Sequence, residues 1–288
     1  MSFPRYPKYK PSEVGWLGEV PEHWEVHRLT HRARIESSNV DKLAREGEIP
    51  VRLCNYTDVY YNDVIVADLP LMDATATADQ TARLTLRADD VVFTKDSETA
   101  DDIAVPAYVP RDLPGVVCGY HLGIARPTNA MSGKFLKWWF ESHSARAQFE
   151  VGARGLTRVG LGRDAISAVA MASPSRAEQA SIADFLDRET AKIDALAAEQ
   201  ERLVELLKEK RQAVISPAVT KGLNPSAPLK PSGIPWLGDV PAHWRVSQIG
   251  HVAALMVGFP FQSEKFSFDP KAGLPLVRGE NVGEGWLR

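Results

Sequence analysis

The clearest pattern of hydrophobic positions lies between residues 176 and 214. Eleven positions there follow one another at alternating steps of three and four residues, and seven of the eleven are apolar. This spacing is typical of a helix with a coiled-coil seam, because each step returns to the same side of the helix. Ser175 and Glu178 form a capping box before it, and Pro217 and Gly222 indicate its end. The sequence therefore predicts one long helix. Its apolar seam consists of Ile182, Leu186, Ile193, Leu196, Leu203, Leu207 and Val214.

The charged faces of this helix leave two interpretations open. Lysine, arginine and glutamate occupy the positions away from the seam, which favours solvation and ion pairing over burial inside a globule. The segment is then either a surface helix of one domain or a helix that pairs with a second long helix. In a pair, the polar seam positions would set the register. These are Gln179, Glu189, Gln200 and Lys210.

Before the helix, the pattern changes to short apolar runs bounded by Gly, Pro and Asp, which predicts strands. Residues 135–149, FLKWWFESHSARAQF, instead have the apolar spacing of one amphipathic helix. Strands and helices are thus mixed, and we expect an α+β domain. The predicted strands are 51–53, 91–94, 105–109 and 119–124.

The chain also repeats itself at an offset of 220 residues. KPSEVGWLGEVPEHWEVHRL at 10–29 returns as KPSGIPWLGDVPAHWRVSQI at 230–249, with 11 of 20 positions identical. Both copies keep two tryptophans with a Leu-Gly turn and a proline between them, which predicts a hydrophobic latch at the start of a domain. A weaker echo links 49–59 with 274–284. We therefore expect a second domain of the same kind, and a second latch near the end of the long helix.

The repeat sets the expected domain boundaries. The first copy fills the chain up to the long helix, whereas the second has only 59 residues before the chain ends. We therefore expect a second domain that is incomplete. The expected segments are a first domain at 1–174, the long spacer helix at 175–216, a linker at 217–229 and the start of the second domain at 230–288.

Composition adds limits on location and on global charge. The chain has 288 residues, 44% of them hydrophobic, and its formal net charge is −3. Nothing in the overall charge indicates nucleic acid or an acidic membrane surface, so such a role must rest on a local patch. Two cysteines cannot build a disulfide framework, and neither a signal segment nor a long apolar run occurs. We expect a cytoplasmic protein with reduced thiols and no membrane contact.

A local basic patch does exist. Residues 126–163 hold seven basic and two acidic residues, a net charge of +5. Within it the loop VGARGLTRVGLGRD at 151–164 combines glycine, where the backbone can approach phosphates, with arginine, which can reach guanine edges. A second candidate is FTKDSETADD at 93–102, where Lys, Ser and Thr follow a strand end among four acidic neighbours. Those acids argue against simple phosphate binding, but such a loop could read base amino groups. Either loop could instead be only a solvated surface.

Motifs for catalysis and metal binding are not convincing. His23, His27 and His31 are spaced as a metal-binding helix face, but the repeat has Ser247 at the middle position, and nearby Pro and Trp favour an extended latch. The common phosphate-binding, dinucleotide-binding, zinc-protease and serine-hydrolase motifs are missing from the sequence. We expect neither a metal site nor catalytic residues, and interpret the chain as a binder rather than an enzyme.

Taken together, several segments resemble the DNA specificity subunit of Type I restriction-modification systems. They are WLGEVPEHWEV, TKDSETADDIAVPA, CGYHLGIARP, ARGLTRVGL, PSRAEQASIADFLDRETAKIDAL and EKRQAVISPAVTKG. The resemblance implies target recognition domains of mixed α/β fold that each read half of a split DNA site, and long helices that pack antiparallel and set the spacing. The candidate DNA-binding residues are Lys95, Ser97, Thr99, Tyr120, His121, Arg154, Thr157, Arg158 and Arg163.

The same resemblance implies partners and places cofactors outside this chain. The partners are double-stranded DNA, the modification (methyltransferase) subunits, which hold S-adenosylmethionine, and the restriction subunit, which uses ATP and magnesium. This chain departs from the pattern by ending at Arg288, inside the second recognition domain. We therefore expect a homodimer through 175–214 and a split palindromic target. Alternative functions are a stand-alone nuclease or methyltransferase, or a coiled-coil adaptor that does not bind DNA.

Overall fold

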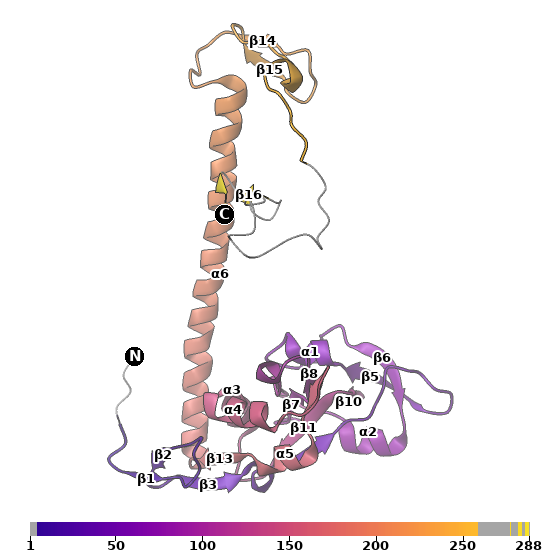
Figure 1. Ribbon diagram of the computed structural model, residues 1–288. Coiled ribbons are helices and arrows are strands. Elements are labelled where there is room, and N and C mark those ends of the chain that lie inside the picture. The colour runs from indigo at the N-terminus through magenta and orange to yellow at the C-terminus, as the bar shows by residue number, and fades with distance from the viewer. Residues whose placement is uncertain (1–4, 259–276, 278–281, 284–285, 288) are drawn as a thin grey trace, which may run out of the picture. The chain divides into compact units, whose positions relative to one another are not determined.

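A computed structural model describes residues 5–258, 277, 282–283 and 286–287 of the chain. Its contacts divide the chain into two compact units, residues 1–200 and 201–288. The first unit contains two main sheets covered by helices, and the helix α6 (Arg176–Lys221) begins in it (Figure 1). This mixture of sheets and helices, followed by one long helix, confirms the predicted α+β class.

An antiparallel sheet in the order β4–β11–β7–β9 forms the centre of the first unit. Strand β7 (Val91–Thr94) matches the predicted strand at 91–94, and its four residues are all buried. Gly123 of β11 lies opposite Phe93, and a Cβ on Gly123 would come within 2.5 Å of the Phe93 ring. Glycine is therefore what lets this aromatic ring cross the neighbouring strand. The other strands are β4 (Ala33–Ser37), β9 (Pro106–Tyr108) and β11 (Leu122–Pro127).

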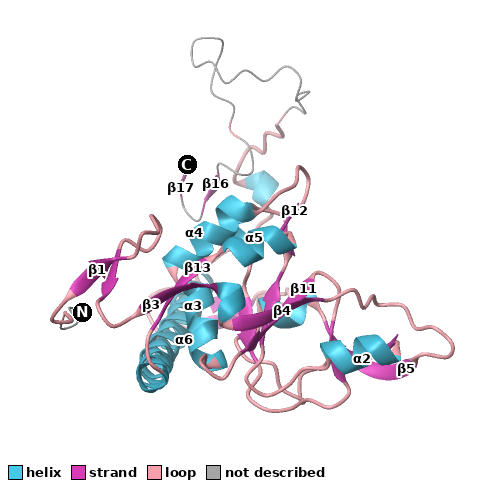
Figure 2. Ribbon diagram, turned by 90° about the horizontal axis from the view of Figure 1, so that it is seen from below, coloured by secondary structure: helices cyan, strands magenta, loops and turns pink. Residues whose placement is uncertain are grey.

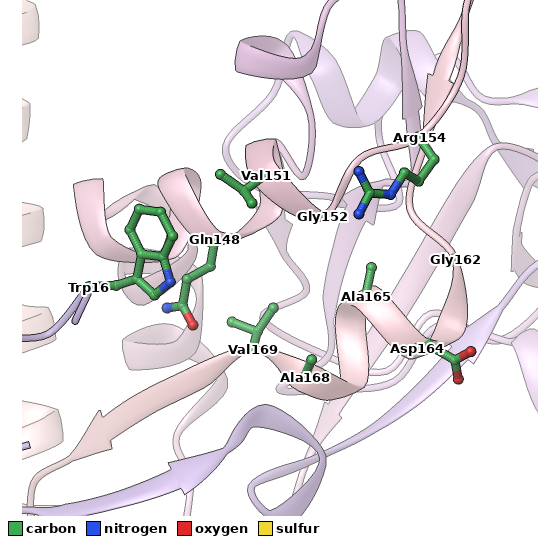
Figure 3. A pocket seen from close by; sticks show the side chains of 10 residues that line it. All are labelled: Trp16, Gln148, Val151, Gly152, Arg154, Gly162, Asp164, Ala165, Ala168 and Val169. Atoms are coloured by element: carbon green, nitrogen blue, oxygen red, sulfur yellow. The ribbon is translucent and has the colours of Figure 1, made fainter. Parts of the chain in front are cut away.

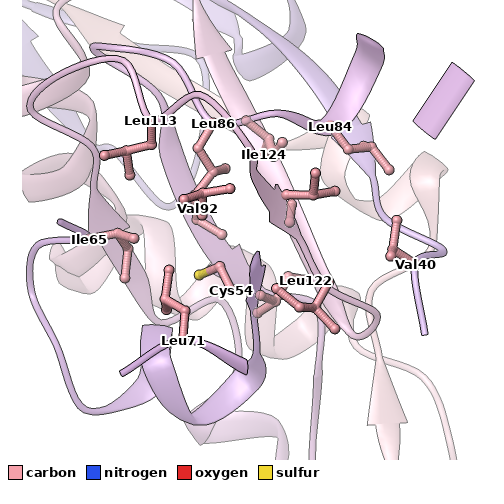
Figure 4. Packing of buried hydrophobic residues seen from close by; sticks show 14 of the residues in the cluster. Val40, Cys54, Ile65, Leu71, Leu84, Leu86, Val92, Leu113, Leu122 and Ile124 are labelled. Carbon is pink, nitrogen blue, oxygen red and sulfur yellow. The ribbon is translucent and has the colours of Figure 1, made fainter. Parts of the chain in front are cut away.

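A second sheet, in the order β10–β5–β6, packs on the first through a shared apolar cluster (Figure 4). Leu53 from this sheet and Ile124 from the central one are fully buried in that cluster. Cys54 and Cys118 are register partners on two parallel strands of the second sheet and are also fully buried. The strands are β5 (Ile49–Cys54), β6 (Met72–Ala76) and β10 (Val116–Cys118), and the helices α1 (Tyr56–Tyr60) and α2 (Ala78–Leu84) follow β5 and β6.

The predicted helix at 135–149 is in fact two helices, α3 (Gly133–Glu141) and α4 (His143–Gly152). Ser142 separates them because its side chain caps the second helix, where it accepts a hydrogen bond from the Ala145 amide. The turn lets both helices contribute to one aromatic cluster. Phe140 and Phe149 stack with ring centroids 5.1 Å apart, and Phe93 of the sheet lies 5.2 Å from Phe140.

Short elements complete the first unit. Figure 2 shows α5 beside α4, and strands β3 and β13 next to the start of α6. These elements were not predicted, because none has more than six residues or a regular apolar spacing. They are β3 (Glu25–Arg28), β8 (Asp96–Ser97), β12 (Val159–Gly160), α5 (Arg163–Ala168), β13 (Ala170–Ser173) and the 3-10 turns Leu29–His31 and Ala100–Asp102.

The first turns of α6 are anchored in this unit. Gln179 is fully buried, donates to the carbonyls of Ala130 and Pro174, and accepts from the Ser132 amide. Ile182 packs against the aromatic core. The expectation that Gln179 sets the register of a helix pair is therefore wrong, and Ile182 is partly covered by its own domain. Apolar spacing alone does not distinguish packing on a domain from packing on another helix.

Helix α6 also continues past Pro217, where the sequence indicated its end, and stops at Lys221. A proline inside a helix lacks one N–H donor and crowds the carbonyl four residues earlier. The residues beyond it still have their own N–H groups, and here the helix resumes. Gly222 then has a φ of +79°, the left-handed conformation that commonly terminates helices. None of the helices in the described residues combines the length and apolarity needed to cross a membrane.

The two copies of the repeat fold alike. Strands β1 (Tyr9–Pro11) and β2 (Glu19–Pro21) pair in the register that β14 (Leu229–Pro231) and β15 (Asp239–Pro241) repeat 220 residues later. The turn bond from the Ser12 amide to the Gly18 carbonyl, 2.9 Å, returns as the bond from Ser232 to Gly238, 3.0 Å. The predicted repeat is thus confirmed as two matching β-hairpins.

The tryptophans of the latch have different roles. Trp24 donates from Nε1 to Glu178 at the start of α6, and Trp244 lies against Gly222 at its end. Trp16 and Trp236, in contrast, are 51% and 83% exposed. Only the second tryptophan of each copy therefore pins a latch to the helix.

The copies diverge after the latch. In the first, β3 pairs with β13 and Leu29 is fully buried. In the second, the described residues contain no counterpart of β13, and Ile249, which corresponds to Leu29, is 65% exposed. The echo at 274–284 lies outside the described residues, apart from residue 277 and strand β16 (Val282–Gly283), which pairs with β17 (Trp286–Leu287).

Candidate nucleic-acid interface

The Gly- and Arg-rich loop predicted at 151–164 folds into a small hairpin after α4. Arg154 and Gly160 exchange two backbone hydrogen bonds, 3.0 and 2.8 Å long, and thereby close what we call the 154–160 hairpin. Gly155 has a φ of +147°, and a Cβ there would lie 2.0 Å from the Arg158 carbonyl oxygen. The tip therefore requires glycine. Four of its side chains are exposed, namely those of Arg154, Leu156, Thr157 and Arg158.

The base of this hairpin is attached to the second predicted loop, 93–102. Strand β12 pairs with β8, so that Gly160 faces Asp96, and the Leu161 amide donates to the Lys95 carbonyl at 2.8 Å. A Cβ on Gly160 would come within 2.6 Å of Asp96 Oδ1. The two segments, which appeared in the sequence as separate candidates, form one site.

The turn that holds Tyr120 and His121 adjoins the same site. The Lys95 amide donates to the His121 carbonyl at 2.8 Å, and His121 Nδ1 lies 2.5 Å from Asp96 Oδ2. His121 has a φ of +71°, which is unusual for a residue with a side chain. Tyr120 is half exposed, and its ring lies 4.0 Å from that of His121 and 5.8 Å from Lys95 Nζ. A cation, an imidazole and a phenol thus meet where the inner strand β7 ends and the neighbouring strand β11 begins.

Helix α1 adds two tyrosines that the sequence analysis missed. The rings of Tyr56 and Tyr60 stack at 5.5 Å, and the Arg158 guanidinium lies 6.0 Å from the Tyr56 ring. Tyr60 donates its hydroxyl to Asp102 at 2.9 Å, and this hydrogen bond raises the pKa of Tyr60. The four-residue spacing of the tyrosines, directly after a strand, was the signal that could have identified them.

The acidic and basic side chains of the site differ in whether they have partners. Asp96 is held by His121 and Asp102 by Tyr60, so these acidic groups of the second loop are occupied by neighbours. Within the described part of the chain, no carboxylate forms an ion pair with Arg154 or Arg158. The guanidinium groups are therefore available to an anionic ligand.

Two predicted residues lie at the margin of the site. Thr99 is exposed and hydrogen bonds to Asp101, which lowers the pKa of that carboxyl group. Arg163 is exposed at the first position of α5, beyond the base of the hairpin. The assembled part of the predicted set comprises Lys95, Tyr120, His121 and the hairpin residues. Ser97 lies beside them on β8 but is buried, so its side chain is not accessible to DNA.

A cavity of about 480 Å³ adjoins Arg154 on the side of α4 and α5 (Figure 3). Trp16, Val151 and Val169 supply apolar surface to its lining. Gln148, which also lines it, donates to the Ala170 carbonyl and accepts from the Ala170 amide, so its polar atoms are used for folding. The cavity offers shape and apolar contact but few free polar groups.

The predicted helix interface divides into two parts. Ile182 and Leu186 lie near the domain, where Lys134 pairs with Asp184 at 3.0 Å and Trp138 donates to Asp187 at 2.7 Å. The later seam positions are exposed to a large extent. They are Ile193 at 64%, Leu196 at 57%, Leu203 at 47%, Leu207 at 54% and Val214 at 63%.

Neither family models nor curated proteins match the sequence. Several solved structures, in contrast, match the fold of this chain. A chain from a study titled "Structural basis underlying complex assembly and conformational transition of the type I R-M system" matches with a TM-score of 0.55 and 16% identity, over 71% of this chain and 47% of that one.

Two further solved chains match less closely. The HsdS subunit from Thermoanaerobacter tengcongensis gives a TM-score of 0.47 at 16% identity, over 71% of this chain and 46% of that one. The Type-I restriction-modification S subunit from M. genitalium gives 0.39 at 13%, over 65% and 44%. This chain thus spans about half the length of the chains that it matches. It has the fold of a chain solved in work on the type I R-M system.

Proposed function

We propose that this chain is a DNA specificity subunit of a Type I restriction-modification system and that its first unit reads one half of a split target. The observation that supports this most directly is the 154–160 hairpin, on a fold shared with a chain of such a system. The hairpin's two guanidinium groups form no ion pair with a carboxylate among the described residues. Restriction systems act on DNA, and the guanidinium groups of the hairpin are of the kind that bind phosphates and guanine edges. The chain itself is proposed to be non-catalytic.

Within the site, different groups suit different tasks. Guanidinium groups on a narrow hairpin can form paired hydrogen bonds to O6 and N7 of guanine in the major groove. Lys95 and Tyr120 suit contacts with phosphate or sugar, which position the protein without reading sequence. The Asp96 carboxylate, oriented by His121, could accept a hydrogen bond from the amino group of cytosine.

The exposed part of the seam on α6 is proposed as a docking surface. Burial of large aliphatic side chains contributes about 1.5 kcal/mol or more each, before the cost of association is subtracted. A second long helix of the same pattern would cover these residues. When no other specificity chain is present, we propose that a second copy packs antiparallel about a two-fold axis. The DNA target would then be a split palindrome.

The remaining partners follow from the same proposal. The modification subunits would bring S-adenosylmethionine, and the restriction subunit would bring ATP and magnesium. Purified chain that cut or methylated DNA alone would instead favour a stand-alone enzyme.

The test removes each hairpin guanidinium separately. A randomised duplex library is enriched on the full chain, and the affinity of the selected duplex is then measured by fluorescence anisotropy. Arg154→Ala and Arg158→Ala should each weaken binding by about 1 to 3 kcal/mol, a five- to 150-fold loss, if the side chain contacts a base. Affinity for unrelated duplex should change little.

A matched control is Arg111→Ala, since Arg111 is exposed on a loop outside the site. It should bind like wild type. Unchanged affinity and unchanged selected sequence in both hairpin variants would exclude the hairpin from the interface. An adaptor without a DNA role would enrich no sequence at all.

A further inference from the structure

We infer that Leu156, at the tip of the 154–160 hairpin, recognises thymine by contact with its 5-methyl group in the major groove. This inference rests on the proposed function, because it assigns a base to a side chain that no part of that proposal used. Leu156 was not among the residues that the sequence indicated.

The first observation is exposure. Leu156 retains 104% of its reference accessible area, the highest value among the large hydrophobic residues of the described chain. Val159, three residues further on, packs partly against the aromatic core, so the hairpin does have an apolar surface on which a side chain can rest. Leu156 does not use it. An aliphatic side chain kept entirely in water gains nothing for folding and is available to a ligand.

The second observation is that the backbone holds this position at the tip. The paired bonds between Arg154 and Gly160 close the loop, and the left-handed Gly155 immediately precedes Leu156. The leucine is therefore presented by a constrained turn and not by a long flexible segment. Less conformational entropy is lost when such a side chain meets its ligand.

The third observation is the charge on either side. Residues 151–163 include three arginines and no acidic residue, and Arg154 and Arg158 each stand two positions from Leu156. An apolar tip between free guanidinium groups suits an anionic surface that also offers an apolar group. The DNA major groove is such a surface, because phosphates border it and the thymine methyl is the apolar group on its base edges. It is also wide enough to admit a two-stranded ribbon.

The experiment compares thymine with uracil in the selected duplex. The duplex enriched on the wild-type chain is synthesised again with deoxyuridine at each thymine in turn, which removes one methyl group and leaves base pairing intact. For the wild type, one substitution should weaken binding about fourfold, the loss expected for one buried methyl group. For Leu156→Ala, the same substitution should leave affinity unchanged, although that variant binds the thymine duplex more weakly than wild type.

Three further variants test whether the dependence on the thymine methyl group belongs to Leu156, to any exposed leucine or to the neighbouring arginine. Leu156→Met keeps an aliphatic tip and should retain most of the dependence on the methyl group. Leu43→Ala removes another exposed loop leucine, 62% exposed, and should keep the wild-type ratio. Arg154→Ala should weaken both duplexes equally and keep the ratio, because the leucine remains.

The outcomes also separate this inference from the proposed function. If the wild type enriches no sequence, both fall. If it enriches a sequence that lacks thymine, or if uracil has no effect on wild-type binding, only the role of Leu156 is overturned. The same holds if Leu156→Ala keeps the wild-type ratio, which would indicate that another residue contacts the methyl group. A leucine that anchors a partner protein instead would leave DNA selection by the Leu156→Ala chain unchanged.

Discussion

Replacement of Glu178 by glutamine tests how the latch of the first repeat is held to the long helix. The Glu178 carboxylate accepts hydrogen bonds from Tyr6 at 3.1 Å and Trp24 at 3.3 Å, and His23 Nε2 lies 3.0 Å from it. Ser175 at the helix start adds its hydroxyl at 3.1 Å. Glutamine keeps the shape of the side chain but removes the charge that these donors share.

The structure sets the size of the effect. Burial raises the pKa of Glu178, but the hydrogen bonds from His23, Trp24 and Tyr6 outweigh it and lower the pKa from 4.5 to about 2. This pKa difference between the unfolded and the folded chain corresponds to a stabilisation of the folded state by about 3 kcal/mol at most. The side chain is 26% exposed, and screening by water reduces the contribution. We expect Glu178→Gln to cost about 1 to 2 kcal/mol at neutral pH.

The pH dependence follows from the direction of that change. Because the pKa is lower in the folded chain, the unfolded chain binds more protons between about pH 4.5 and pH 2. The stabilisation is therefore complete above about pH 4.5 and disappears as the pH falls toward 2. In the glutamine variant this part of the acid dependence should be missing, so the two proteins should converge in stability near pH 2.

Hydrogen exchange is the suitable assay because the loss is expected first in the latch. Amides of β1 and β2 should exchange about five to thirty times faster in Glu178→Gln at pH 7, whereas those of β7 should change less. Glu199→Gln is the matched control, since Glu199 is exposed on the same helix. Equal exchange in wild type and Glu178→Gln, or a loss of equal size in Glu199→Gln, would refute this account of the latch.

Two further predictions concern the helix and the thiols. In sedimentation at tens of micromolar, the double variant Leu196→Asp with Leu203→Asp should shift the chain toward monomer. The control double variant Ala191→Asp with Ala198→Asp, on the helix face opposite the seam, should not. A wild type that is already monomeric would contradict the homodimer. Burial raises the pKa of both Cys54 and Cys118. The native chain at pH 8 should therefore not react with a thiol reagent such as DTNB until it unfolds, when two thiols should react. Rapid reaction of the folded chain would contradict this and would show that the second sheet opens readily.

The sequence predicted best those elements whose pattern is local. Strand β7 was correct to the residue because three apolar positions in a row and a β-branched threonine are bounded by charged residues. The break at Ser142 was missed because the apolar spacing continues across it, although a serine before a helical run is a known capping signal.

The site was harder to predict because its parts are distant in sequence. Strands β8 and β12 have two residues each and lie more than fifty positions apart, so nothing local indicates that they pair. For the same reason the sequence showed acidic residues in the second loop but not that His121 and Tyr60 engage two of them. Tertiary contacts decide which charges remain free, and those contacts are not encoded in any short motif.

The closed base of the 154–160 hairpin has a consequence for how this protein can change over generations. Its fold depends on two backbone bonds and two glycines, whereas the side chains at its tip are all exposed. Substitutions at exposed positions without such constraints usually alter stability by less than about 0.5 kcal/mol. Mutations at positions 156–158 can therefore accumulate without loss of the folded state. Under the proposed function, a lineage would acquire new target preferences through three codons while the rest of the domain stays under selection for packing.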